Sequence, residues 1–419
     1  MKKNCWVVLL WCAAANVWAQ AAPSQDWTLQ QVLDRVAVAN RDVLAARRAL
    51  DGAQADRVTA GVSPAPVLSV STLSINPANL GQGSLWTRPV DTIVRVDTPF
   101  ERGGKAAWRE KVADLGVQAA RLDVDDVVRQ QQMAAAQAYW SLKLAQEQWQ
   151  ISRANEALAL SSSDLARTRM AQGDLSRLEA TRLSVEAQRA ANERDQARQQ
   201  WQAAQIALTQ LLALDPVAIA AQDAWPDVPA TLTANDTSSI EARPDVLAAV
   251  QRVAQAEAAL SLAQAQRSAD VTVGLQFEHN PPTGARLWGV GLSVPLGVDG
   301  RQDGPVTKAR LGLEMAQADL DRVRATAVAD LVARRLALSV AQDRADRIEH
   351  QLLPQAREAA RAADFARQQG ALSLQDVLDA RRTLHAAEID AAAAHADVAL
   401  ALAALSPLSL SQASDRHTP

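Results

Sequence analysis

Apolar and polar residues alternate in two neighbouring segments in the second half of the chain. In DVTVGLQFE (270–278), valine, leucine and phenylalanine occupy every second position, with polar residues or glycine between them. LWGVGLSV (287–294) repeats the pattern, and the intervening HNPPTGAR is typical of a turn. A period of two over about nine residues predicts strands with one apolar face. Such strands suit an antiparallel hairpin on a soluble domain, and also a tilted hairpin that crosses an outer membrane.

The first half of the chain carries a weaker copy of this pattern. VLSVSTLSIN (67–76) changes phase midway, whereas Val90, Val94 and Val96 alternate with polar residues. Two further strands are therefore predicted at about 66–98, to match the pair at about 270–295.

Very long helices are predicted beside these strands. Residues 105–172 contain no proline and one glycine, which predicts a single helix about 100 Å long. Residues 305–369 are similar but contain Pro354, which should kink or restart the helix. Single helices are also predicted at about 28–57 and 240–267. Helices of this length do not fit a compact domain and indicate a coiled coil or a helical array.

Two short glycine-containing segments interrupt the long helices. QGDLSRLEA (172–180) and QGALSLQDVLDA (369–380) each place a glycine where one helix should end. A serine three residues later should cap the next helix, with a carboxylate three positions further on, as in a capping box. The residues are Gly173, Ser176 and Glu179 in the first copy and Gly370, Ser373 and Asp376 in the second. Each segment is therefore predicted to be the tip of a helical hairpin.

The seams of these hairpins are predicted to carry large apolar residues. They are Leu158, Leu165, Leu178 and Leu183 in the first hairpin and Leu374, Val377, Leu378 and Leu384 in the second.

The sequence contains an internal repeat, in which this order of predicted elements occurs twice. VDTPFERGGK (96–105) aligns with LSVPLGVDGR (292–301) at an offset of about 196 residues, and the glycine segments align at about 197. The unit predicted from this is helix-strand-strand-helix-helix. The predicted organisation is a signal peptide (1–21), a first repeat (22–215), a linker (216–239), a second repeat (240–405) and a C-terminal tail (406–419).

The N-terminus and the composition narrow the function. Residues 1–21 are typical of a secretory signal peptide and contain both cysteines, Cys5 and Cys12, so no disulfide is expected in the mature chain. A lipid anchor on Cys12 is the alternative, although Trp11 stands where a small residue is expected. The net charge of −4 among 419 residues offers no basic surface for nucleic acid. No later apolar run is long enough for a transmembrane helix.

An enzyme is not predicted. The five histidines are scattered, and His385 and His395 are too far apart for a metal-binding pair on one helix turn. RGGK (102–105) lacks the upstream glycine and the Ser/Thr of a phosphate-binding loop. We therefore expect no catalytic residue, cofactor or dedicated metal site.

The number of strands predicts an oligomer if they cross a membrane. Four strands cannot close a barrel, because known membrane barrels begin at about eight, and an open strand edge is not tolerated in lipid. Several chains would have to pool their strands, and three chains would supply twelve.

The order of these elements resembles that of the TolC-type outer-membrane efflux proteins. TPFERGGK, SVPLGVDGR, RPDVLAAVQRVAQAEAAL (243–260) and GALSLQDVLDA carry the resemblance, which covers essentially the whole mature chain. It implies a mainly α protein with a small β part, in which a homotrimer forms a 12-stranded outer-membrane β-barrel joined to a long α-helical periplasmic tunnel. The implied partners are outer-membrane lipid, a periplasmic adaptor (membrane fusion) protein and an inner-membrane RND-type pump.

Some segments are more similar to the heavy-metal, CzcC-like subgroup. ERGGKAAWRE and the region from RPDVLAA to GLQFEHNP resemble it, which implies export of metal cations. GVDGRQDGP departs from the subgroup, which has an Asn-Arg-Asn-Gly type of turn there. A multidrug or organic-solute efflux channel and a periplasmic coiled-coil scaffold without a barrel are the alternatives.

The resemblance also assigns roles to the hairpin tips. Asp376 and Asp379 match the segment that forms a periplasmic gate, where three chains would make a ring of six carboxylates. From the residues alone, a solvated helix face is the favoured interpretation. The equivalent place in the first copy holds Glu179 and Arg182. The tip residues implied to dock the adaptor are Gly173, Ser176, Gly370 and Ser373.

Overall fold

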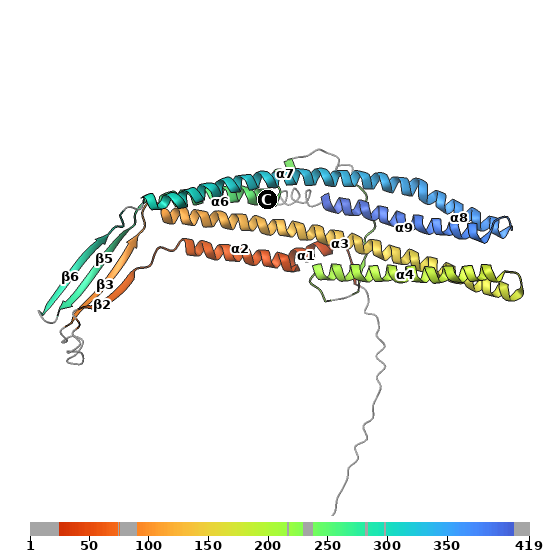
Figure 1. Cartoon of the computed structure of the whole chain (residues 1–419), viewed down its shortest axis with the longest axis horizontal. Helices are drawn as coiled ribbons and strands as arrows, with labels where there is room; N and C mark the ends of the chain where they lie inside the picture. Colours follow the sequence, from red (N-terminus) through yellow and green to blue (C-terminus); the bar gives the residue numbers. More distant parts are fainter. Residues whose placement is uncertain are drawn as a thin grey trace, which may run out of the picture.

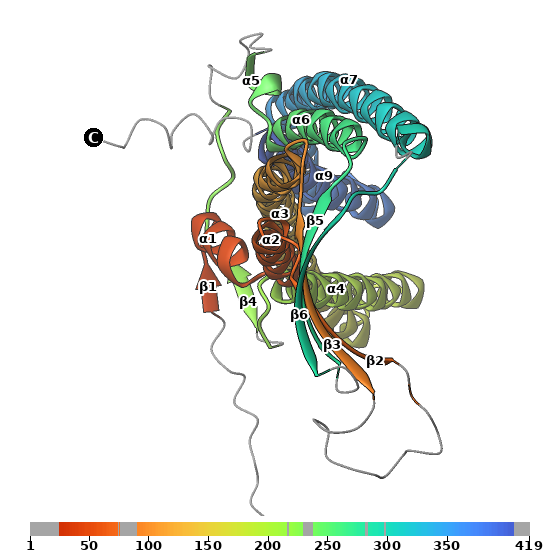
Figure 2. The same cartoon turned by 90° about the vertical axis from the view of Figure 1, so that its left-hand side faces the viewer.

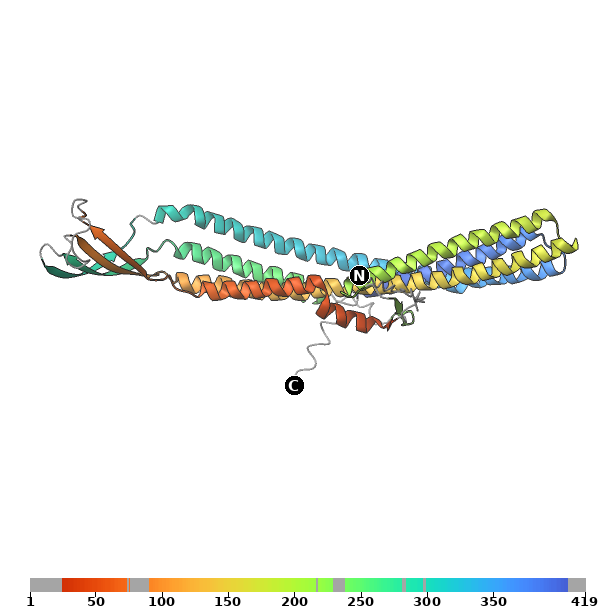
Figure 3. The same ribbon diagram turned by 90° about the horizontal axis from the view of Figure 1, so that it is seen from below.

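The computed structural model describes residues 25–73, 75, 90–215, 218–228, 238–280, 284–296 and 299–405. The predicted signal peptide with Cys5 and Cys12, the predicted tail, and residues 216–217 and 229–237 of the predicted linker lie outside these residues. The chain is a long rod, with a small sheet at one end and two helical hairpins at the other (Figures 1 and 3).

The sheet brings the two halves of the chain together. Its four antiparallel strands are β2 (Val67–Leu73), β3 (Asp91–Phe100), β5 (Val271–Asn280) and β6 (Ala285–Ser293). The order is β2-β3-β5-β6, so the central pair joins a strand from each half. Within the described residues, β2 and β6 therefore form the two edges. A separate pair of short parallel strands, β1 (Gln25–Trp27) and β4 (Ile219–Ala221), lies near the middle of the rod.

The strand register sorts side chains onto two different faces. Directly opposed residues share a face, and one row is Leu68, Val96, Leu275 and Val290, followed by a row of Val70, Val94, Phe277 and Trp288. We call this the apolar face. The alternate rows are Ser69, Arg95, Gln276 and Gly289, and then Val67, Asp97, Gly274 and Gly291. We call this the polar face, and the alternation predicted for β5 and β6 is confirmed.

The helices of the rod follow the order of the strands. Next to the sheet lie α2 (Arg41–Ala60), α3 (Lys105–Gln172), α6 (Pro244–Ala265) and α7 (Asp303–Arg347). Contacts run from α2 to α3, from α3 to α6 and from α6 to α7, which makes a curved layer (Figure 2). Thus α2 and β2 lie at one edge of the molecule, and α7 and β6 at the other. Across the described residues, no helix combines the length and apolar character that a membrane crossing requires.

The two long helical segments differ in continuity. The prediction of one helix across 105–172 is confirmed, since α3 has 68 residues without a break and returns as α4 (Arg177–Leu211). In the second half, α7 runs into a π-helical turn, η4 (Ile348–Leu352), before α8 (Leu353–Gln368) and α9 (Leu374–Leu405). Pro354 stands in the first turn of α8, where its missing N–H is tolerated, and the helix restarts there as predicted.

The predicted helices at 28–57 and 240–267 are wrong as single elements. The first is α1 (Leu29–Ala39) followed by α2, because Asn40 adopts an extended conformation and its side chain accepts from the N–H groups of Asp42 (2.9 Å) and Val43 (3.3 Å). The second is α5 (Ser238–Glu241) followed by α6, with the break before Pro244. A residue that precedes proline avoids the helical conformation, and Arg243 is extended.

A buried aromatic centre fixes the middle of the rod. The Tyr139 hydroxyl lies 2.9 Å from a carboxylate oxygen of Asp223 and accepts from the Asp223 N–H at 3.0 Å. The same carboxylate accepts from the Leu29 N–H, so α1, α3 and the segment after α4 meet here. Burial raises the pKa of Tyr139 well above its usual value, which keeps the hydroxyl protonated as a donor.

Candidate functional site

Both hairpins lie at the end of the rod opposite the sheet, and their tips have the same backbone geometry (Figure 3). Gly173 has φ +83° and Gly370 has φ +75°, the left-handed conformation that favours glycine. The Gly173 N–H donates to the Met170 carbonyl (3.1 Å), and the Gly370 N–H donates to the Arg367 carbonyl (3.0 Å). Each glycine therefore ends its helix and lets the chain reverse.

The serine after each glycine caps the returning helix. The Ser176 hydroxyl accepts from the Glu179 N–H (3.2 Å), and the Glu179 carboxylate accepts from the Ser176 backbone N–H (3.4 Å), which completes a capping box. The hydroxyl also donates to that carboxylate (2.9 Å). In the second tip, the Ser373 hydroxyl accepts from the Asp376 N–H (3.3 Å) and donates to the Asp376 carboxylate (2.6 Å). The hydrogen bond from Ser176, with smaller contributions that include Arg367, lowers the pKa of Glu179.

The seam of the first hairpin is not made by the predicted leucines. Leu158, Leu165 and Leu178 are 48%, 54% and 63% exposed. Between residues 150 and 200, the buried residues of this hairpin are instead small, namely Ser152, Ser163, Ala166, Ala180, Ala187, Ala190 and Ala197. Small side chains let two helix backbones approach closely, so the leucines point away from the seam. In the second hairpin, Val377 and Leu378 are buried as predicted, and Leu374 and Leu384 are half-buried.

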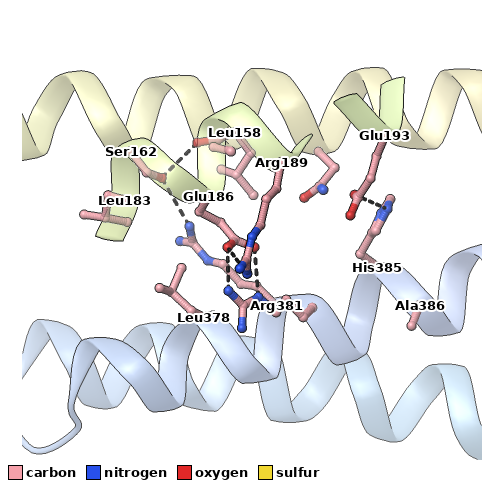
Figure 4. A pocket seen from close by; sticks show the side chains of 13 residues that line it. Leu158, Ser162, Leu183, Glu186, Arg189, Glu193, Leu378, Arg381, His385 and Ala386 are labelled. Carbon is pink, nitrogen blue, oxygen red and sulfur yellow. Dashed lines mark hydrogen bonds and ion pairs between the residues drawn. The ribbon is translucent and has the colours of Figure 1, made fainter. Parts of the chain in front are cut away.

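Leucines that lie outside the seam of the first hairpin form part of the lining of a groove between the two hairpins. A cavity of about 390 Å³ lies between α3, α4 and α9, and a second of about 360 Å³ continues it toward the tips. Ser162, Leu183, Leu378 and Arg381 line both, so the two cavities form one surface, which we call the tip groove (Figure 4).

Acidic residues of α4 face basic residues of the second hairpin across this groove. Glu179, Glu186 and Glu193, spaced seven residues apart, form what we call the acidic row. Their partners are Arg367 for Glu179 (3.3 Å), Arg382 for Glu186 (2.9 Å) and His385 for Glu193 (3.5 Å). Figure 4 shows Glu193 and His385 on opposite walls of the groove.

The central pair is the strongest of these contacts. Two guanidinium nitrogens of Arg382 donate to the two carboxylate oxygens of Glu186, in a bidentate arrangement. This hydrogen bonding lowers the pKa of Glu186 and raises the pKa of Arg382. Next to it, Arg381 donates to Asp364 (2.8 Å) and to Ser162 (3.3 Å), which ties α9 to both α8 and α3.

The predicted gate residues lie at the start of α9. Asp376 and Asp379 are exposed, on the side of the helix opposite the buried Val377 and Leu378. Asp376 is held by the Ser373 cap, and Asp379 accepts from Arg382 at 3.3 Å. In the first copy, Glu179 is bound by Arg367 of the other hairpin rather than by the nearby Arg182.

Sequence reasoning missed the residues that join the hairpins. Glu186, Glu193, Arg367, Arg381 and Arg382 were not singled out, and His385 was treated only as a non-ligand. The seven-residue spacing of the acidic row marks one face of α4, but no local pattern identifies the partners. Within the described ranges, no three His, Cys, Asp or Glu residues are grouped so that they could hold a metal ion.

Comparisons with known proteins agree on one family. The sequence profile of the family described as "Outer membrane efflux protein" matches residues 32–214 and 237–409. The cobalt-zinc-cadmium resistance protein CzcC of Cupriavidus metallidurans is 26% identical over 366 residues, which are 86% of this chain and 85% of that protein. The pyoverdine export outer membrane protein OpmQ of Pseudomonas putida is 27% identical over 417 residues, with 88% and 84% covered.

Solved structures share the fold. A membrane protein from Pseudomonas aeruginosa superposes with a TM-score of 0.76 at 20% identity, covering 91% of this chain and 93% of that one. CusC gives 0.73 at 18% identity with 91% of both chains covered. The outer membrane protein VceC of Vibrio cholerae gives 0.73 at 21% identity, with 91% and 95% covered.

Proposed function

The chain belongs to the outer membrane efflux protein family, and we propose that three copies of it form the exit duct of a tripartite efflux system. In this proposal the sheet is embedded in the outer membrane, and the helices form a periplasmic tunnel. The single observation that carries the proposal is a two-faced, four-stranded sheet at one end of a rod whose other end presents two helical tips.

The dimensions and faces of the sheet support a barrel. Ten residues of β3 extend about 34 Å, which at the usual strand tilt spans the roughly 25 Å apolar band of an outer membrane. The apolar face is exposed in this chain, with Val290 at 81%, Trp288 at 72% and Leu292 at 71%. Lipid would cover it. The edges β2 and β6 would pair between neighbouring copies, and three copies would close twelve strands.

The edges of the helical layer support the same assembly. Val328, Val332, Leu336 and Val340 recur at four-residue steps on α7, and each is 47–63% exposed. At the opposite edge, Val58 of α2 is 73% exposed. A neighbouring copy that brings its α2 against α7 would cover both surfaces, which extends the β2–β6 pairing into the tunnel wall.

The tips are the proposed contact with the export machinery. Gly173, Ser176, Gly370 and Ser373 would dock a periplasmic adaptor protein, and an inner-membrane RND-type pump would drive the transport. Asp376 and Asp379 would form the periplasmic gate. Their exposure and their place beside the tips support this role.

The proposed cargo is heavy-metal cations. The relative CzcC is named for cobalt, zinc and cadmium resistance, and an acidic mouth would concentrate cations. Organic-solute export is the second candidate, because OpmQ, named for pyoverdine export, is 27% identical to this chain.

Membrane fractionation and export together test the proposal. The full chain, expressed with its own leader, should be recovered from the outer membrane as a heat-resistant trimer, and its deletion should sensitise cells to zinc, cobalt or cadmium. A soluble periplasmic species would overturn the channel in favour of a scaffold. Sensitivity to organic compounds without metal sensitivity would overturn the cargo assignment alone.

A further inference from the structure

An ion pair lies on the polar face of the sheet. The Arg95 Nε donates to both carboxylate oxygens of Asp97, at 2.8 and 2.9 Å. The two residues are two positions apart on β3, so both side chains project from the same face. They are partly shielded, with 37% of the Arg95 side chain and 26% of the Asp97 side chain exposed.

Glycines on the neighbouring strands make room for this pair. Gly274 on β5 lies opposite Asp97, and Gly291 on β6 follows in the same row. A Cβ at Gly274 would collide with the Asp97 carboxylate and would lie 2.8 Å from the Arg95 Nη2; a Cβ at Gly291 would lie 3.4 Å from that nitrogen. The guanidinium therefore lies flat across β5 toward β6, on a floor of glycine backbone.

This arrangement matters for conduction if the polar face lines a pore. A flat pair narrows the lumen less than an extended arginine would. Three copies would set three guanidinium groups and three carboxylates at one level of the barrel. When each guanidinium is paired with a carboxylate, this level of the barrel has no net charge from the two residues. An unpaired ring of carboxylates at this level would attract and retain divalent cations, whereas an unpaired ring of guanidinium groups would repel them.

We propose that Arg95 and Asp97 are the charge-selectivity residues of the barrel, and that Arg95 neutralises Asp97 so that cations pass without being held. The proposal rests on the proposed function, since it requires the polar face to line a trimeric pore. The floor formed by Gly274 and Gly291 keeps the pair flat against the wall. The ions concerned are small hydrated ions in general, and divalent cations are the most strongly affected.

The test is the reversal potential of the purified full-length trimer in planar bilayers under a salt gradient. In about 0.1 M salt, Arg95→Gln should raise the cation-to-anion permeability ratio about threefold and create a block by Mg²⁺ added on the barrel side. Asp97→Asn should lower the ratio by a similar factor. The double variant, which removes both charges, should return the ratio close to the wild-type value. Ser69→Asn, on the same face without a change of charge, is the matched control.

Each result decides the proposal. Opposite shifts that cancel in the double variant support it, whereas unchanged selectivity in both single variants, with the trimer intact, overturns it. If either single variant fails to assemble, Gly274→Ala provides the second measurement. It should lift the pair from the wall and reduce single-channel conductance, and an unchanged conductance would also overturn the proposal. A wild-type protein that forms no pore would instead refute the proposed function.

Discussion

The two ends of this molecule are held together in different ways. In the sheet, β3 and β5 come from the two halves of the chain and are joined by continuous backbone hydrogen bonds from Thr92 to Phe100. At the hairpin end, α4 and α9 are joined across the tip groove by side chains, with Arg382 and Glu186 as the bidentate centre.

The difference has an energetic meaning. A backbone ladder within a membrane cannot open without leaving polar groups unpaired in lipid, so a sheet embedded there is a fixed wall. Partly exposed ion pairs contribute about 1 kcal/mol or less each, so hairpins joined by them can separate at little cost. In the proposed assembly, the same chain would therefore combine a rigid end with an end that is able to move.

The largest effect is expected from a charged substitution in the sheet. Val290→Arg places a charge on the apolar face near the middle of β6, which should cost about 2–4 kcal/mol in a bilayer. The heat-resistant trimer in the outer-membrane fraction should fall sharply. Ser293→Arg, on the polar face of the same strand, should leave it nearly unchanged. Equal trimer yields from the two variants would show that the apolar face does not meet lipid.

A smaller effect is expected from breaking one tip. Gly370→Val forces a β-branched residue into a left-handed conformation, at a cost of about 1–2 kcal/mol. Cross-linking to a co-expressed adaptor should weaken while the trimer persists. Gly312→Val, inside α7 with open space around its Cβ position, is the control. Gly173→Val should act like Gly370→Val, and normal cross-linking of both tip variants would place docking elsewhere.

Removing the Glu186–Arg382 ion pair should lower the free energy that holds the two hairpins together by about 0.5–1 kcal/mol, after allowance for solvent screening. Cysteines introduced at Asp174 and Ala371 can carry spin labels, and Arg382→Gln should broaden and lengthen the distance between them. Arg382→Lys keeps the charge but loses the bidentate geometry. Its distance distribution should therefore lie between those of the wild type and Arg382→Gln. An unaltered distance distribution in Arg382→Gln would mean that the pair does not hold the groove closed.

The same pair makes a pH prediction. The pKa of Glu186 is lowered in the folded protein. The stabilisation that its carboxylate provides is therefore fully present above the ordinary glutamate pKa, and it is lost as pH falls through the folded pKa. The difference between wild type and Arg382→Gln should thus be constant from about pH 5.5 to 8, begin to shrink near the ordinary glutamate pKa of about 4.3, and disappear only at lower pH. A difference that persists in acid would assign the effect to packing rather than charge.

The smallest structural effect is expected at the gate. Replacing Asp376 and Asp379 together with Asn should leave the hairpins paired through Glu186 and Arg382 but reduce cation preference and block by divalent cations from the periplasmic side. Glu179→Gln should change both less, since Arg367 already neutralises that carboxylate. If the double variant keeps wild-type selectivity and wild-type block, the two aspartates form only a solvated helix face and have no role in a gate.

Several features could be read from the sequence because they depend on neighbours along the chain. The absence of proline predicted the 68-residue α3, and Pro354 predicted the restart at α8. The glycine and serine of each tip predicted a left-handed helix end followed by an N-cap. Misreadings came from competing local signals: Asn40 capped a new helix where the pattern looked continuous, and alanines took the seam that leucines were expected to fill.

By itself, then, the sequence determined the unbroken length of α3, the two hairpin turns and the alternating faces of β5 and β6, since φ preferences, capping and the side-chain period act over a few residues. Only the tertiary structure decided which side chains meet between those elements. Glu186 and Arg382 are 196 residues apart, nearly one repeat length, and they face each other because the two hairpins lie side by side. Gly274 is small because Arg95 and Asp97, on a strand from the other half of the chain, lie across it. Such pairings depend on how distant segments dock, a choice made by the packing of the whole chain and encoded in no local pattern.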